Sequence, residues 1–159
     1  MSFFRLALGA VTIMTMVPSA VRAQATLGPA VAYHDDFKLG IGAALNVPIQ
    51  EFDEGVAILA DFFYFFPDGS VNYLELNGNL TYSFALDRSP VTPYALAGAN
   101  ISNTSNDFTD TSRTEVGLNL GAGLTFALGR VRPSIGAKIE IGGGRGFVVF
   151  GHLPFVIGR

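Results

Sequence analysis

The stretch "TEVGLNLGAGLTFAL", residues 114–128, alternates with a period of two along its whole length. One set of alternate positions is entirely apolar and comprises Val116, Leu118, Leu120, Ala122, Leu124, Phe126 and Leu128. The other set holds small or polar residues, namely Glu115, Gly117, Asn119, Gly121, Gly123, Thr125 and Ala127. Because successive side chains of a β-strand point to opposite faces, this pattern predicts one long strand with a single apolar face.

The same alternation recurs along the chain and predicts eight strands, at residues 25–33, 38–47, 55–66, 71–84, 92–102, 114–128, 131–141 and 147–158. Turn-forming residues separate them, and Gly129–Arg130 has the form of a tight two-residue hairpin loop. The longest polar link is residues 103–113. Strands of about ten residues are long enough to cross a bilayer at a tilt. The pattern therefore predicts an all-β, eight-stranded antiparallel up-and-down transmembrane β-barrel.

The first residues are expected to direct export. Arg5 precedes the apolar run "LALGAVTIMTMV", and small residues at Val21 and Ala23 suit a signal peptidase. We predict a signal peptide at residues 1–23 and a barrel domain at residues 24–159. Of the 10 basic residues, two fall in this leader, which leaves 8 against 13 acids and a formal net charge of −5. That charge argues against a nucleic-acid partner.

The side chains of the predicted strands sort by size and charge in a way that favours a membrane barrel. Charged residues make up only 14% of the chain, against about 25% in soluble domains. They fall on the faces rich in glycine and other small residues, where a narrow lumen would need small side chains. A basic residue facing lipid would cost up to about 2–4 kcal/mol. The predicted lumenal charge network is Asp61, Glu75, Glu115, Arg132, Lys138 and Glu140.

The stretch "DFFYFFPDG", residues 61–69, sets the orientation of its strand. If Asp61 points into the lumen, then Phe63 and Phe65 also point inward and close the barrel mouth. The alternate rings face lipid, as in the aromatic girdle at a membrane interface. Over the whole chain we predict this girdle to comprise Phe62, Tyr64, Phe66, Tyr82, Phe84, Tyr94 and Phe126.

Two other classes of protein compete with this interpretation. A secreted soluble barrel of the lipocalin kind would bind an apolar ligand inside an apolar lumen. An outer-membrane lipid-modifying enzyme would need a catalytic histidine and serine, and neither His34 nor His152 has a serine two residues later. We expect His34 to lie in a solvated turn and His152 in the lumen. No catalytic, cofactor or metal site is predicted.

The segments "VTPYALAGANIS", "EVGLNLGAGLTFAL" and "RPSIGAKIEI" resemble the central hairpins of small eight-stranded outer-membrane barrels, of the outer-membrane protein A and X type. The resemblance covers the mature chain and implies a Gram-negative outer membrane, lipid contacts, a monomer and recognition by the barrel assembly machinery during insertion. Such barrels usually end in an aromatic residue, whereas here Phe155 lies near the end, Arg159 is last and Pro154 interrupts the strand. A structural or surface-contact role, with contact through residues 103–113 and no open pore, is expected.

Overall fold

The computed structural model describes residues 25–49, 53–67, 71–106, 109–129, 131–143 and 145–157, and the predicted signal peptide lies outside these ranges. No helix in this described part of the chain is long and apolar enough to cross a membrane. The strands are β1 (Ala25–His34), β2 (Lys38–Pro48), β3 (Val56–Phe65), β4 (Val71–Ser83), β5 (Val91–Asn106), β6 (Thr111–Phe126), β7 (Ser134–Gly142), β8 (Gly146–His152) and β9 (Phe155–Ile157).

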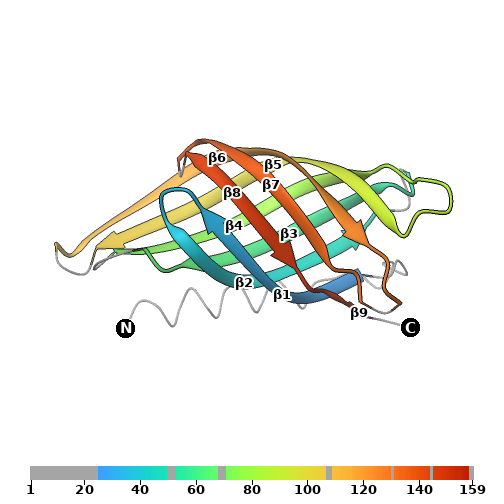
Figure 1. The fold of residues 1–159 in the computed structure, drawn as a ribbon. Helices are drawn as coiled ribbons and strands as arrows, with labels where there is room; N and C mark the ends of the chain where they lie inside the picture. Colours follow the sequence, from blue (N-terminus) through green and yellow to red (C-terminus); the bar gives the residue numbers. More distant parts are fainter. Residues whose placement is uncertain are drawn as a thin grey trace.

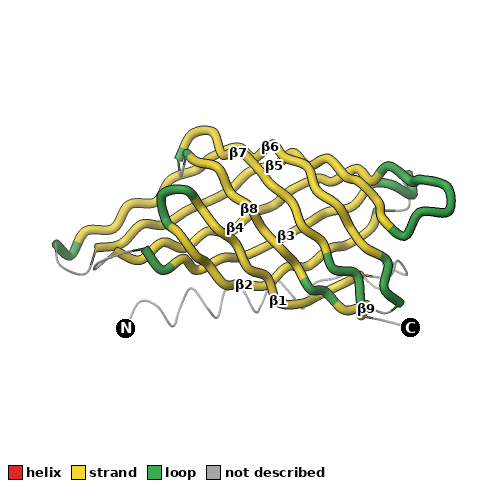
Figure 2. The backbone as a smooth tube through the Cα atoms, in the orientation of Figure 1, coloured by secondary structure: helices red, strands yellow, loops and turns green. Residues whose placement is uncertain are grey.

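The strands close into a barrel in which β1 to β8 each pair antiparallel with their neighbours in sequence (Figures 1 and 2). Closure occurs at β1, which pairs with β2 along one side and with β8 and β9 along the other. Ala25 pairs with Ile157, so the first and last strands meet at one end of the barrel. We call this the inner end and the opposite one the outer end. The predicted eight-stranded antiparallel barrel is confirmed.

The last wall of the barrel consists of β8 and β9 in a single register on β1, with Ala30 opposite His152 and Leu27 opposite Phe155. The sequence predicted one strand over residues 147–158, and the structure interrupts it at Pro154. Proline has no N–H to donate to the ladder and fits poorly inside a sheet. The interruption therefore lies at the residue that lacks this donor.

The β5–β6 hairpin is longer than predicted, because residues 103–106 and 111–113 continue the two strands rather than forming a loop. Side chains support the extension, since the Asn103 amide donates to Ser112 Oγ at 3.0 Å and to Thr114 Oγ1 at 2.9 Å. Conversely, β7 begins only at Ser134, three residues later than predicted. Between β6 and β7, Leu128 and Val131 exchange backbone hydrogen bonds. Gly129, which follows Leu128, has a φ of 67°, as a tight hairpin requires.

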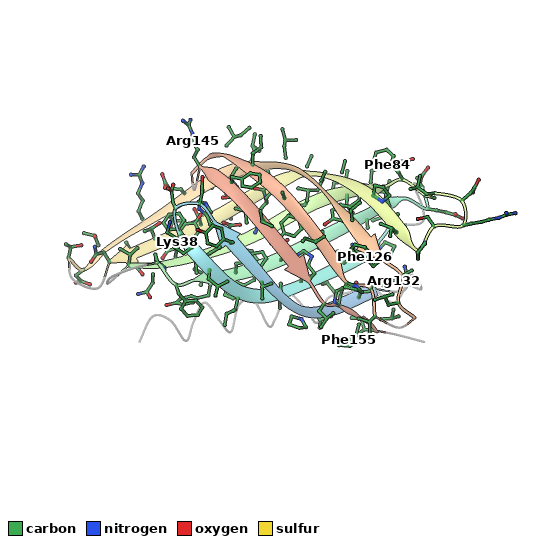
Figure 3. The ribbon with its side chains drawn as sticks, in the orientation of Figure 1. Lys38, Phe84, Phe126, Arg132, Arg145 and Phe155 are labelled. Carbon is green, nitrogen blue, oxygen red and sulfur yellow. The ribbon has the colours of Figure 1, made fainter. Side chains whose placement is uncertain are left out.

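The two faces of the barrel wall are oriented as the alternation predicted. Leu118 and Leu120 are 60% and 49% exposed on the outside, whereas Asn119 between them is 1% exposed in the lumen. The same outward display of apolar side chains surrounds the barrel in Figure 3. A soluble barrel with an apolar interior would show the reverse, so the lipocalin-like alternative is not supported.

Glycine on the lumenal face makes room for large neighbours. A Cβ atom added to Gly136 on β7 would lie 2.5 Å from Cζ of Phe150 and 2.9 Å from the hydroxyl of Tyr94. At Gly40 on β2, the added atom would lie 2.7 Å from Cδ1 of Phe65. An eight-stranded barrel has just enough interior for its own side chains. In both cases the ring belongs to the residue directly opposite the glycine on the adjacent strand, which is Phe150 for Gly136 and Phe65 for Gly40.

Candidate functional site

Lys138 spans the lumen from β7 to β4. Its ammonium group donates to Glu75 Oε1 at 2.7 Å and lies 2.8 Å from Glu140 Oε1. The side chain of Lys138 is 2% exposed, and both carboxylates are fully buried. A buried charge is tolerated only when it is paired and hydrogen-bonded. The three groups therefore depend on one another and tie opposite parts of the wall together.

Asn77 is the hub that extends this ionic cluster into a wider polar layer. Its amide donates to Glu75 Oε1 at 2.6 Å and to Asp61 Oδ1 at 2.7 Å, and its carbonyl oxygen accepts from Lys138 at 2.6 Å. Asn119 also donates to Asn77, at 2.7 Å. Further amide contacts join Asn119 to Asn79 and to Asn100. Asn77 and Asn119 thereby use both their amide nitrogen and their carbonyl oxygen, which favours a single arrangement at the centre of the layer, whereas Asn100 Oδ1 at its edge has no hydrogen-bond partner in the described structure.

An aromatic cluster lies in the lumen at the outer end. Phe37, in the β1–β2 turn, stacks on Tyr73 with ring centroids 3.7 Å apart and an interplanar angle of 5°. The ring of His34 lies 5.9 Å from those of Phe65 and Tyr73, and His34, Phe65 and Tyr73 are all fully buried. Phe63 and Phe65 both point inward, as predicted, but only Phe65 belongs to this cluster at the mouth, whereas Phe63 lies deeper, near His152. We call His34, Phe37, Phe65 and Tyr73 the outer aromatic cluster.

Toward the inner end, the ring of His152 packs near Phe150 and Phe63, with centroids 5.0 and 6.3 Å away. Its Nδ1 lies 3.4 Å from Ser134 Oγ, at the long end of the hydrogen-bond range. His152 is 5% exposed, as expected for a lumenal residue. Below it a cavity of about 860 Å³ occupies the inner end, lined in part by Tyr94, Ser134 and His152.

The structure corrects the prediction for His34, which is fully buried rather than solvated. The reason is strand parity, since Ala30, Ala32 and His34 share the inward face of β1. Ligand atoms of His34, Asp35 and Asp36 lie within 4.8 Å of one another. However, Nδ1 of His34 already accepts backbone N–H groups of the following turn, so we assign no metal site there.

Four of the six predicted lumenal charges meet in one cluster: Asp61, Glu75, Lys138 and Glu140. Glu115 does not join them. It lies above the cluster on the extended hairpin and pairs with Arg113 at 2.7 Å, with its side chain 31% exposed. Arg132 is exposed and lines the inner cavity instead. Both residues lie on or near predicted strands, but at levels along the barrel axis that differ from that of the Lys138 cluster.

Most residues of the predicted aromatic girdle lie on the outer surface. Phe62, Phe66, Tyr82 and Phe84 are exposed and Tyr64 and Phe126 are half-buried. Figure 3 places Phe84 and Phe126 toward the same end of the barrel as Phe155. Their contact with the membrane interface stays a prediction.

Tyr94 was wrongly assigned to this girdle, because it is only 6% exposed and points into the lumen. On β5 the inward face also carries Leu96, Asn100 and Ser102, each buried. The period of two links Tyr94 to the polar residues Asn100 and Ser102, and this signal was available in the sequence. Residue type had been given more weight than parity.

Sequence reasoning did not identify the asparagine layer as a unit. Period-two alternation places Asn77 and Asn79 on the same face of their strand as Glu75, and Asn119 on the same face as Glu115. It does not say which positions on different strands lie at the same level along the barrel axis. Asn100 completes the layer through its bond to Asn119, 2.7 Å long. Four inward asparagines on three strands were the only signal.

Comparisons with known proteins agree with this architecture. The family model described as "Outer membrane protein beta-barrel domain" matches residues 6–147. No curated protein sequence matches the chain. Among solved structures, the N-terminal β-barrel domain of Pseudomonas aeruginosa OprF is similar with a TM-score of 0.66 and 14% identity, covering 84% of this chain and 96% of that one.

Two further structures share the fold. Neisserial surface protein A (NspA) is 17% identical with a TM-score of 0.56, and the match covers 82% of this chain and 91% of NspA. The attachment invasion locus protein Ail of Yersinia pestis is 18% identical with a TM-score of 0.51, covering 82% and 96%. These identities support the fold alone. The family model spans most of the chain, and the exterior of the barrel is apolar, as a membrane-spanning barrel requires. The protein therefore belongs to the outer-membrane β-barrel domain family of Gram-negative bacteria.

Proposed function

We propose that the protein is a closed structural barrel of the outer membrane, with a side-chain-filled lumen, rather than an open porin or an enzyme. The observation that carries this proposal is the contact of Lys138 on β7 with Glu75 on β4 across the lumen, with Glu140 of β7 pairing with the same ammonium group. The outer aromatic cluster lies beyond it and adds a second obstruction. A filled lumen of this kind stiffens the wall and leaves no continuous aqueous channel.

Conductance tests the closed lumen. The purified protein, refolded into planar lipid bilayers at neutral pH, is expected to give no steady open-channel current. A Glu75→Gln, Glu140→Gln double variant removes both charges that hold Lys138 and should increase the frequency of current events. Glu115→Gln is the matched control, because Glu115 pairs outside the cluster. A stable ohmic current from the wild-type protein would refute the closed-barrel proposal.

We propose further that the β5–β6 hairpin is a surface-contact element, as residues 103–113 were predicted to be. The pairing of β6 with β7 starts only at Gly117, whereas its pairing with β5 reaches Thr111. The hairpin therefore rises beyond the neighbouring strand, as Figure 1 also shows. Its exposed Ser and Thr side chains, Thr109, Thr111 and Ser112, are suited to polar contacts with a partner.

This arrangement predicts that the hairpin is accessible from outside the cell. The chain has no cysteine, so a single Thr109→Cys substitution gives an unambiguous label site. A polymer-linked maleimide, too large to pass through porins, is expected to label Thr109→Cys on intact cells. The control is Asp87→Cys in the exposed β4–β5 turn at the inner end, which should react only after lysis. Labelling in the opposite pattern would exclude the hairpin from surface contact.

A further inference from the structure

The β1–β2 turn is anchored by the imidazole of His34. Its Nδ1 accepts the backbone N–H of Asp36 at 3.0 Å and that of Phe37 at 3.4 Å. In a neutral imidazole only one nitrogen accepts, so the hydrogen-bond pattern assigns the proton to Nε2. That nitrogen faces Glu140, with Nε2 3.8 Å from Oε2. The neutral form of His34 is therefore the form that holds the turn.

The turn carries the part of the outer aromatic cluster that covers the mouth. Phe37 stacks on Tyr73 and lies 4.8 Å, centroid to centroid, from the ring of His34. Lys38, which follows, has a φ of 64°, a conformation that non-glycine residues adopt at a cost. The turn is also tied to β8, because the Asp35 N–H donates to the Phe147 carbonyl and the Phe147 N–H donates to Asp35 Oδ1, each at 3.1 Å. The contacts with His34 and Tyr73 are the ones that hold the Phe37 ring over the lumen.

Protonation of His34 would reverse the role of Nδ1. An imidazolium donates from both nitrogens and accepts at neither, so the N–H groups of Asp36 and Phe37 would lose their shared acceptor. The Asp36 N–H would keep a second acceptor, Asp35 Oδ1 at 3.1 Å, so the larger effect is expected at Phe37. The new donor has a partner nearby, because Asp35 Oδ1 lies 3.1 Å from Nδ1. The other nitrogen would attract Glu140 away from Lys138, which is bound to both carboxylates.

Charged and titratable groups surround the buried ring of His34. They come from three elements packed against it and comprise Asp35 in the turn, Tyr73 and Glu75 on β4, and Lys138 and Glu140 on β7. Within the described residues, Asp61, Glu75 and Glu140 oppose the single ammonium of Lys138 in this cluster. A second positive charge at His34 would offset part of the acidic excess.

We propose that the β1–β2 turn is a pH-responsive lid over the outer mouth, held closed by neutral His34 and released when His34 takes up a proton. The inference rests on the proposed function, since a lid has meaning only over a lumen that is otherwise closed. Release removes the backbone anchor of Phe37 and, through Glu140, loosens the contact with Lys138 beneath it.

The test uses His34→Asn, since the Oδ1 of asparagine occupies nearly the position of Nδ1 and accepts the same backbone N–H groups but takes up no proton. The wild-type and variant proteins are compared in detergent micelles by amide NMR between about pH 7.5 and about pH 5, where histidine ordinarily changes charge. In the wild type, the Asp36 and Phe37 signals are expected to shift, and their exchange should quicken about fivefold or more after correction for intrinsic rates. In His34→Asn neither change should occur.

The lid is refuted if the wild-type amides do not respond, or if His34→Asn responds equally. Phe37→Ala gives a second measurement that does not depend on the anchor. Because the Lys138 cluster would still block the lumen, the substitution is made in the Glu75→Gln, Glu140→Gln background, where it should raise the frequency of current events further at both pH values. No effect of this substitution at either pH would also refute the lid. A steady wild-type current at neutral pH would instead refute the closed-barrel proposal, so the two failures are distinguishable. Heat-modifiable gel mobility verifies that each variant is folded.

Discussion

A Lys138→Leu variant is expected to lose about 3–5 kcal/mol of its free energy of unfolding, because removing one partner leaves buried charges uncompensated. Glu75 and Glu140 are both fully buried and both lie within 2.8 Å of the Lys138 ammonium. The measurement is a urea titration of the protein in lipid vesicles, followed by gel mobility of the folded and unfolded bands.

Two companion variants isolate the cause of that loss. Arg113→Leu breaks an exposed ion pair and should cost no more than about 1 kcal/mol. Adding Glu75→Gln and Glu140→Gln to Lys138→Leu removes the stranded charges and should recover much of the stability. If Lys138→Leu were as mild as Arg113→Leu, the lumenal network would not be a stabilising element.

The second large effect is expected on the outside of the barrel. Leu120 lies about midway along β6 and is 49% exposed on the apolar surface. Replacing it with arginine should destabilise the inserted barrel by about 2–4 kcal/mol, because a basic side chain would face hydrocarbon. The fraction of protein that refolds into vesicles, read from heat-modifiable mobility, and the urea midpoint both report this cost.

The control for this prediction lies on the same strand and the same face. Ser112 belongs to the extended part of the hairpin and is exposed, so Ser112→Arg should leave insertion and the urea midpoint nearly unchanged. Equal tolerance of arginine at both positions would mean that Leu120 does not face lipid. Equal damage at both would point to a general effect of arginine on β6.

Strand parity is the property that the sequence alone determined. Each side chain's face depends on its neighbours one and two residues away, so Leu118 was placed outward and Asn119, Lys138 and Glu140 inward. The same rule places His34 and Tyr94 inward. Both predictions were wrong because the polar turn beside His34 and the aromatic character of Tyr94 were weighted above parity. Chain closure followed from the number of strands and the outward apolar surface.

Only the tertiary structure decided the level of each inward side chain along the barrel axis. Lys138 meets Glu75, 63 residues away, and Asn77, 61 residues away, because strand tilt and stagger bring these positions to one level. Glu115 shares their inward face but lies on the extended hairpin, where it meets Arg113 instead. Alternation has a period of two and carries no information on stagger between strands. The partners of each inward charge were therefore set when the sheet closed on itself.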